Sequence, residues 1–256
     1  MKVAAIQHDI VWEDAAATRD HVAPLIAEAA GKAARLIVLT EMYATGFSMH
    51  PERIGEDEGG PNEQFLLAQA AEHDAYLVAS VAQRGPDGAY RNNAILAAPD
   101  GTAHRYAKIH PFSYAHEHEH YAAGDQHLTV DVDGLRVTLF VCYDLRFADE
   151  FWACADRTDL YVVPANWPEP RRDHWMALLR ARAIENQAYV VGVNRVGTVK
   201  SAVYVGDSAI IDPLGRTLAE GDPEETVLLA GVDSATVSAV REQFPFLVDR
   251  RAVRLA

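Results

Sequence analysis

Short apolar runs of strand length alternate with longer helix-like segments along almost the whole 256-residue chain. Apolar runs of about four to eight residues rich in Val and Ile indicate buried strands, whereas a repeat near 3.6 residues indicates a helix. Alternation of the two kinds of segment is typical of an α/β domain, in which helices cover the faces of the sheets. Turn signals such as Gly85–Pro86–Asp87–Gly88 add hairpins to the alternation. The pattern therefore predicts two mixed sheets or one large one, with helices packed outside.

Periodicity and turn residues predict the individual elements. Asp14 is a candidate N-cap for the first helix. The expected helices are 15–33, 62–73, 146–156, 171–187 and 233–244. The expected strands are 2–7, 35–40, 75–82, 92–98, 104–108, 128–132, 135–141, 159–165, 188–194, 204–211, 217–219 and 226–232. Residues 109–126 form a long polar connection without periodicity, and such connections are often functional. Because no repeat or linker interrupts the pattern, we expect residues 1–256 to form one domain.

The charge and the cysteine content exclude several classes of function. A net charge of −14 argues against nucleic acid and anionic membranes as partners, since both need a basic surface. No apolar run reaches the roughly 18 residues of a membrane span, and the N-terminal run reads as a strand, not as a signal peptide. Two cysteines offer no disulfide framework, so we expect a cytoplasmic protein with reduced thiols. Without a GxGxxG motif or a P-loop, no nucleotide cofactor is expected.

An apolar strand, 137–141, ends at Cys142, and a turn with a helical segment follows. A thiol at a strand-to-helix junction lies near unpaired backbone N–H groups and partial positive charge, which favour the thiolate. The arrangement is similar to the nucleophile elbow of α/β-hydrolases, with Cys in place of Ser. A single buried cysteine is more often a packing residue, and Cys154, inside a helical pattern, is predicted to be one.

Two charged residues end other predicted strands. Glu41 follows strand 35–40, and Lys108 ends strand 104–108 just before the long polar connection. Active sites of α/β proteins are built at the carboxyl ends of strands. Taken singly, Glu41 could be a solvated loop residue and Lys108 a surface residue. Together with Cys142 they supply a base, a cation and a nucleophile at the ends of three strands.

Three motifs in this order resemble those of the nitrilase superfamily of carbon–nitrogen hydrolases, and the resemblance spans nearly the whole chain. The motifs are Leu39–Thr40–Glu41–Met42, Tyr106–Ala107–Lys108–Ile109–His110 and Val141–Cys142–Tyr143–Asp144–Leu145–Arg146–Phe147. Further segments are similar to the omega-amidase branch of that superfamily, namely 42–49, 163–171, 181–190, 194–197 and 204–208. Pro111 and residues 198–203 depart from the pattern of the branch near the expected pocket rim.

The resemblance implies a fold and a mechanism. The fold is a four-layer αββα sandwich of two mixed β-sheets with outer helices. Cys142 is the implied nucleophile, and Glu41 is the base that takes its proton. Lys108 and the backbone N–H of Tyr143 would hold the oxyanion, and Glu117 would position the substrate and Lys108. The resemblance also implies that no cofactor or metal is needed and that the chain forms a homodimer.

The branch resemblance implies a small-molecule amide as substrate, a monoamide of a dicarboxylic acid such as 2-oxoglutaramate. The second carboxylate of that substrate needs an arginine. Arg171, which follows the loop after strand 159–165, is the candidate. Tyr43, Phe47 and Trp167 are candidates for the pocket walls, although aromatic side chains commonly serve packing alone.

Other activities stay open at this point. Within the superfamily they are nitrilase, carbamoylase and aliphatic amidase activity, and a non-catalytic interaction protein is less favoured. His116, His118 and His120 alternate with two glutamates. On a strand this spacing would place three imidazoles on one face, where they could bind zinc in a metal-dependent hydrolase.

Overall fold

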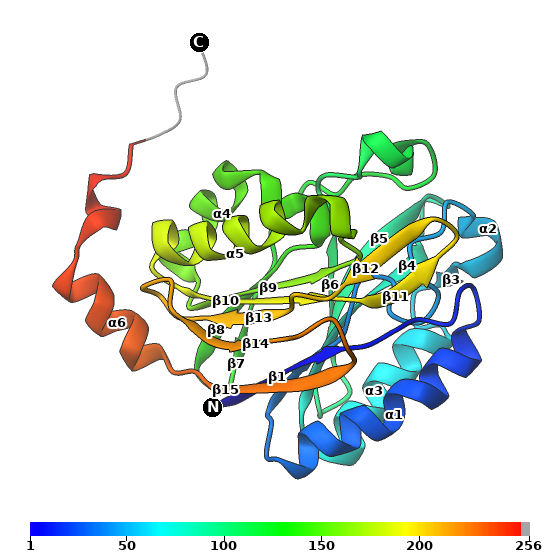
Figure 1. Cartoon of the computed structure of the whole chain (residues 1–256), viewed down its shortest axis with the longest axis horizontal. Coiled ribbons are helices and arrows are strands. Elements are labelled where there is room, and N and C mark those ends of the chain that lie inside the picture. The colour runs from blue at the N-terminus through cyan, green and yellow to red at the C-terminus, as the bar shows by residue number, and fades with distance from the viewer. Residues whose placement is uncertain (252–256) are drawn as a thin grey trace.

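Two β-sheets form the centre of the computed structural model, which describes residues 1–251 (Figure 1). The first sheet has seven strands in the order β15-β1-β2-β4-β5-β6, and β3 pairs with β4. β1, β2 and β4 run parallel to one another, whereas β15, β5 and β6 pair antiparallel. Its strands are β1 (Lys2–Gln7), β2 (Leu36–Val38), β3 (Glu56–Asp57), β4 (Tyr76–Arg84), β5 (Tyr90–Ala97), β6 (Ala103–Ala107) and β15 (Thr226–Gly231).

The second sheet has six strands in the order β14-β13-β10-β9-β8-β7, and β11 and β12 form a separate hairpin. β8, β9 and β10 are parallel, and every residue of β9 and β10 is buried. Such strands are covered on both faces, which explains their continuous apolar sequences. The strands are β7 (Thr129–Val132), β8 (Leu135–Leu139), β9 (Leu160–Ala165), β10 (Tyr189–Asn194), β11 (Val196–Val199), β12 (Ala202–Val205), β13 (Ala209–Ile211) and β14 (Thr217–Glu220).

Helices cover the outer face of each sheet, which gives the four layers expected for the αββα sandwich (Figure 1). Residues of β1 alternate between two layers, because Ala4 and Ile6 pack with α1 and α3, whereas Val3 and Ala5 pack with residues of the second sheet. On the far side, the Tyr161 hydroxyl of β9 donates to the Phe151 carbonyl of α4 (2.8 Å). The helices are α1 (Ala15–Gly31), α2 (Pro51–Ile54), α3 (Pro61–His73), α4 (Ala148–Cys154), α5 (Arg172–Asn186) and α6 (Ser234–Gln243).

Capping groups mark where the helices begin and end. The Asp14 carboxylate accepts a hydrogen bond from the Ala17 N–H (3.0 Å), as the sequence predicts. Asp233 caps α6 in the same way through the Thr236 N–H (2.7 Å). α5 ends at Asn186, and the next residue, Gln187, has a left-handed backbone (φ 49°) that stops the helix and turns the chain toward β10.

The sequence pattern does not predict the short elements α2, β3 and β11, and two further segments differ from their predicted structure. Residues 204–211 are not one strand, because β12 ends at Val205 and the left-handed Gly206 and Asp207 turn the chain before β13 begins. The polar connection 109–126 contains two short 3-10 helices, Ser113–Ala115 and Glu117–Glu119. Neither feature has a hydrophobic period, so the sequence pattern does not reveal them.

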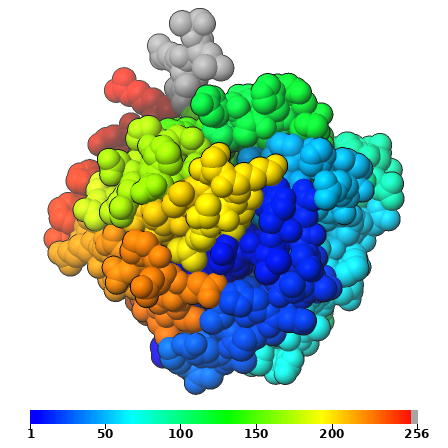
Figure 2. Space-filling model, turned by 45° about the vertical axis from the view of Figure 1, so that its right-hand side comes forward, coloured from blue at the N-terminus to red at the C-terminus, as the bar shows by residue number. Residues whose placement is uncertain are grey.

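The β11–β12 hairpin packs against the loop that follows β1, and the two adjoin as yellow and blue surfaces in Figure 2. The Lys200 ammonium lies 5.6 Å from the Trp12 ring centroid. The Arg195 guanidinium, just before β11, pairs with the Asp9 carboxylate. The hairpin is thereby fixed over one edge of the sandwich. Within residues 1–251, none of the helices has the length and apolar character needed to cross a membrane.

Leu139 should be essential to the packing between the sheets. It pairs with Val162 on the face of the second sheet opposite Tyr161, and it is fully buried in the core that includes Val3 and Val78. We expect Leu139→Ala to lower the free energy of unfolding by about 2–5 kcal/mol, because it leaves a cavity. Urea unfolding measures this value. Leu218→Ala, at a 43% exposed position, is the control, and an equal loss in both variants would contradict the packing role.

Candidate active site

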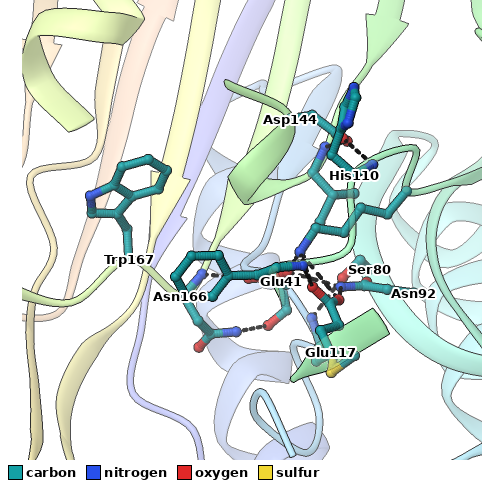
Figure 3. Close-up of polar contacts among 12 residues, drawn as sticks. Glu41, Ser80, Asn92, His110, Glu117, Asp144, Asn166 and Trp167 are labelled. Carbon is teal, nitrogen blue, oxygen red and sulfur yellow. Dashed lines mark hydrogen bonds and ion pairs between the residues drawn. The ribbon is translucent and has the colours of Figure 1, made fainter. Parts of the chain in front are cut away.

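Strand ends from both sheets converge on one small region (Figure 3). Glu41 follows β2 of the first sheet, and Lys108 directly follows β6. Cys142 and Asn166 follow the parallel strands β8 and β9 of the second sheet. The carboxyl ends of parallel strands meet at one edge, where α/β proteins place active sites. The structure thus brings together the base, the cation and the nucleophile predicted from the sequence.

A buried lysine lies between two buried glutamates. The Lys108 ammonium donates to Glu41 Oε1 (2.9 Å) and to Glu117 Oε2 (2.8 Å), and none of the three side chains is more than 1% exposed. Burial alone would lower the pKa of Lys108, but the carboxylates of Glu117 and Glu41 outweigh it and hold this pKa well above its ordinary value. Lys108 is therefore a permanent cation in the site.

Neutral donors fix the two glutamates. The Asn92 side-chain amide, from β5, donates to Glu41 Oε1 (2.9 Å) and to Glu117 Oε1 (3.0 Å). The Asn166 backbone N–H donates to Glu41 Oε2 (2.8 Å), and the Phe112 N–H donates to Glu117 Oε2 (2.5 Å). Buried carboxylates need such partners, and these donors hold both groups in one orientation (Figure 3).

Cys142 lies in a strained turn. Its φ is +45°, in the left-handed region that side chains other than glycine seldom adopt, and the 3-10 helix Cys142–Arg146 follows. The Asp144 carboxylate stabilises the turn by accepting the Val141 N–H, the His110 N–H and the Tyr106 hydroxyl, each at 2.9 Å. Burial raises the pKa of Asp144 to about 6. The left-handed φ of Cys142 ends the strand direction, and the Cys142 side chain lines a cavity.

The resting thiol of Cys142 is protonated. Burial raises its pKa well above the ordinary value, and the charge and hydrogen bond of the Glu41 carboxylate raise it further, whereas Lys108 lowers it. From the strand-to-helix position, the sequence predicts that partial positive charge favours the thiolate of Cys142. In the structure this effect is smaller than the opposing effects of burial and of the Glu41 carboxylate. The Glu41 carboxylate lies within hydrogen-bonding reach of the thiol, so it is the group available to accept the proton.

Cys142 opens onto a cavity of about 220 Å³. The predicted residues Phe47, Trp167 and Arg171 line it, and Arg146 lines it as well. The Phe47 ring centroid lies 5.2 Å from the Lys108 ammonium. The remaining aromatic lining residues are Phe112, Tyr114, Tyr143 and Tyr204. The cavity is therefore an aromatic pocket with a thiol and arginine side chains in its wall.

Tyr43 does not line this cavity, so its prediction as a pocket residue is wrong. Its side chain is fully buried in the layer between the first sheet and its helices. The Tyr43 hydroxyl donates to the Asn62 carbonyl (2.9 Å), and its ring stacks on Phe65 of α3. Proximity to Glu41 in sequence suggested the pocket, but the turn after Glu41 directs Tyr43 to the opposite side.

The three histidines considered for zinc do not lie on a strand. His118 is part of the 3-10 helix Glu117–Glu119, and His116 and His120 flank it. The Glu117 side chain points inward to Lys108, whereas His116 pairs with the exposed Glu119 carboxylate. In the part of the chain that the structure describes, no group of three His, Cys, Asp or Glu residues is arranged to hold a metal ion.

Comparison with known proteins agrees with this geometry. The family model for carbon-nitrogen hydrolases matches residues 2–242. The chain belongs to the carbon–nitrogen hydrolase family. It is 40% identical to the omega-amidase YafV of Yersinia enterocolitica over 97% of this chain and 96% of that protein. It is 34% identical to the 2-oxoglutaramate amidase of Bacillus subtilis over 88% of each chain.

A solved structure of this family has the same fold. XC1258 from Xanthomonas campestris, described as a CN-hydrolase superfamily protein with an arsenic adduct in its active site, superposes with a TM-score of 0.94. It is 36% identical in sequence, and the match covers 100% of this chain and 99% of that one. These matches confirm the nitrilase-like fold and the omega-amidase branch inferred from the motifs, and the chain is a hydrolase of carbon–nitrogen bonds other than peptide bonds.

Sequence reasoning missed several residues of this candidate site. Asn92 lies inside an apolar strand, and no pattern distinguishes it from a solvent-facing residue of that strand. Asn166 and Asp144 carry a weak signal, because each lies within two residues of a strand end or of Cys142. Tyr204 reaches the cavity from the β11–β12 hairpin, and only the tertiary structure brings it there.

Removing the Glu41 charge should lower the pKa of the Cys142 thiol, because that carboxylate raises it by its charge and by a hydrogen bond. In a Cys154→Ala background, Glu41→Gln should therefore shift the pH midpoint of Cys142 alkylation by iodoacetamide to lower pH. Glu72→Gln, the same change on the exposed face of α3, is the control. An unchanged midpoint in Glu41→Gln would show that Glu41 does not control the thiol.

Proposed function

We propose that the chain is an omega-amidase that hydrolyses the amide of small dicarboxylate monoamides, such as 2-oxoglutaramate, to an acid and ammonia. The observation that carries the proposal is the buried ammonium of Lys108 between Glu41 and Glu117, beside the Cys142 thiol at the cavity. Relatives named omega-amidase and 2-oxoglutaramate amidase support the substrate class.

In the proposed mechanism, Cys142 Sγ attacks the amide carbon while Glu41 takes the thiol proton. The negative oxygen that develops is held by the Lys108 ammonium and the backbone N–H of Tyr143, and one such donor is typically worth about 3–4 kcal/mol. Glu41 returns the proton to the nitrogen, ammonia leaves, and a thioester remains. Water then attacks the thioester with Glu41 as base, which releases the acid and restores the thiol.

Glu117 has a positioning role in this scheme. Its carboxylate shares the Lys108 ammonium with Glu41, and both carboxylates share the Asn92 amide. Glu41 can therefore accept and release a proton while Lys108 stays charged and in place. Asn166 complements this arrangement, because its N–H holds the second oxygen of Glu41 (2.8 Å) and keeps the carboxylate oriented throughout the reaction.

Arg171 is proposed to bind the distal carboxylate of the substrate. It lines the cavity, and its guanidinium lies 5.2 Å from the Phe112 ring centroid. Arginine binds carboxylates through two parallel hydrogen bonds, which fixes the orientation of a small acid. Phe47 and Trp167 would form apolar walls for the carbon chain between the two polar ends.

A panel of amides tests the function. We expect the wild-type chain to release ammonia from 2-oxoglutaramate more efficiently than from an aliphatic nitrile or a neutral aliphatic amide, because these two offer no carboxylate to Arg171. It should also prefer 2-oxoglutaramate to a carbamoyl amino acid, whose ureido carbon is less electrophilic than an amide carbon. Cys142→Ala should reduce turnover to background. Cys154→Ala, a change at the packing cysteine, is the control. A nitrile or carbamoyl preference would reject the omega-amidase assignment, and full turnover by Cys142→Ala would reject the mechanism.

We also propose that the chain works in the cytoplasm as a homodimer, with its thiols reduced. Support comes from the outer face of α5, where Met176 and Ile184 are 36% and 50% exposed beside a groove that also contains Ala177 and Ala181. Apolar side chains exposed side by side, with polar residues such as Asp173 and Arg180 beside them, are a feature of association surfaces. Sedimentation equilibrium should give twice the mass of the chain, and Ile184→Glu should reduce it. A single-chain mass for the wild type would contradict the dimer.

A further inference from the structure

Two arginines from different elements line the same cavity. Arg146 is the last residue of the 3-10 helix that begins at Cys142, and Arg171 comes just before α5. Other arginines of this acidic protein form ion pairs with carboxylates. Arg172, for example, which follows Arg171 in sequence, pairs with Asp207 (2.7 Å). Among residues 1–251, no carboxylate pairs with the guanidinium of Arg146 or of Arg171. The cavity wall therefore carries two uncompensated positive charges.

A single tryptophan supports both arginines. The Arg146 guanidinium lies 4.8 Å from the Trp167 ring centroid, and the Trp167 indole N–H donates to the Arg171 carbonyl (2.7 Å). Trp167 itself is fixed, because its backbone N–H donates to Asn194 Oδ1 (2.7 Å). Arg146 also donates to His174 Nδ1 (3.1 Å). Guanidinium groups held on aromatic rings lose little freedom when they bind a planar anion.

The cavity offers no carboxylate to an ammonium group. Its lining residues include no Asp or Glu. The nearby carboxylates of Glu41 and Glu117 already accept from Lys108 and Asn92. A cation beside the distal carboxylate of a substrate would thus meet two guanidinium groups without a compensating acid, and like charges at short range repel strongly in a site of low dielectric constant.

We propose that Arg146 is a second specificity-determining residue, which binds the distal carboxylate together with Arg171. The pair selects monoamides whose carboxylate has no neighbouring ammonium, so 2-oxo and unsubstituted acid amides are accepted and 2-amino acid amides are rejected. This inference rests on the proposed amidase function. It adds to that function the electrostatic device that distinguishes glutaramate-like substrates from glutamine.

Three five-carbon amides test the pair, namely glutaramate with a carboxylate, pentanamide without charge, and glutamine with a carboxylate and an ammonium. Ammonia release gives kcat and KM for each. We expect the wild type to prefer glutaramate over both others. Arg146→Gln should lower kcat/KM for glutaramate about 100-fold, mainly through KM, since one charged partner of the carboxylate is lost. Its kcat/KM for pentanamide should stay within about twofold, and its discrimination against glutamine should shrink.

Matched variants separate charge from structure. Arg216→Gln removes an exposed positive charge in the turn between β13 and β14, and we expect it to retain the wild-type ratios. Arg146→Lys keeps the charge but not the planar group, so its preference for glutaramate should lie between those of the wild type and Arg146→Gln. If Arg146→Gln does not fold, Arg146→Lys still tests the proposal. A wild-type ratio of kcat/KM for glutaramate to kcat/KM for pentanamide in Arg146→Lys would show that the planar guanidinium of Arg146 does not bind the carboxylate.

The outcomes distinguish this inference from the proposed function. An equal loss for glutaramate and pentanamide in Arg146→Gln, or an unchanged preference, would overturn the role of Arg146 while the amidase function stands. The role of Arg146 would also be rejected if Arg171→Gln, but not Arg146→Gln, changed the preference for glutaramate over pentanamide. If the wild type released ammonia from none of the monoamides, the proposed function itself would fall, and the inference with it.

Discussion

The buried ammonium of Lys108 between Glu41 and Glu117 is the interaction on which the rest of the site depends. Moving charges out of water is costly, and only close opposite charges and full hydrogen bonding offset that cost. Here the offset comes from distant parts of the chain: Asn92 lies in β5, Asn166 follows β9, and the Phe112 N–H belongs to the segment after β6. The cluster therefore requires both sheets to be in place before it can form.

Much of this arrangement follows from rules that a sequence displays. Glu41, Lys108 and Cys142 each lie just after the end of a strand, and parallel strands bring their carboxyl ends to a common edge. The convergence of a carboxylate, an ammonium and a thiol was therefore predictable. The layered architecture followed from apolar runs that alternate with helices. These predictions succeed because they depend on backbone direction and on periods of two and 3.6 residues, which the sequence carries locally.

Other features of the site depend on where side chains point in the folded molecule. No local sequence pattern predicts this. Tyr43 lies two residues from Glu41 yet packs against Phe65, because the turn after β2 sends it to the helix layer. Arg146 and Tyr204 reach one cavity from different elements, Cys142–Arg146 and the β11–β12 hairpin. The protonated state of Cys142 likewise follows from burial beside the Glu41 carboxylate, whereas the strand-to-helix position alone favoured a thiolate.

The buried cluster of Lys108, Glu41 and Glu117 also restricts how the site can change during evolution. Two carboxylates and one ammonium share a small set of donors. Replacing Lys108 leaves two buried carboxylates without a cation, and replacing either glutamate leaves buried donors of Lys108 and Asn92 without an acceptor. A protein lineage that replaced this cluster of Lys108, Glu41 and Glu117 would need several coordinated substitutions, each unfavourable by itself. Side chains of the cavity wall such as Phe47, Arg171 and Tyr204 do not share a buried charge, because they come from separate loops and a hairpin. New substrates are thus accessible by single steps at the wall, while the bond-breaking chemistry stays the same.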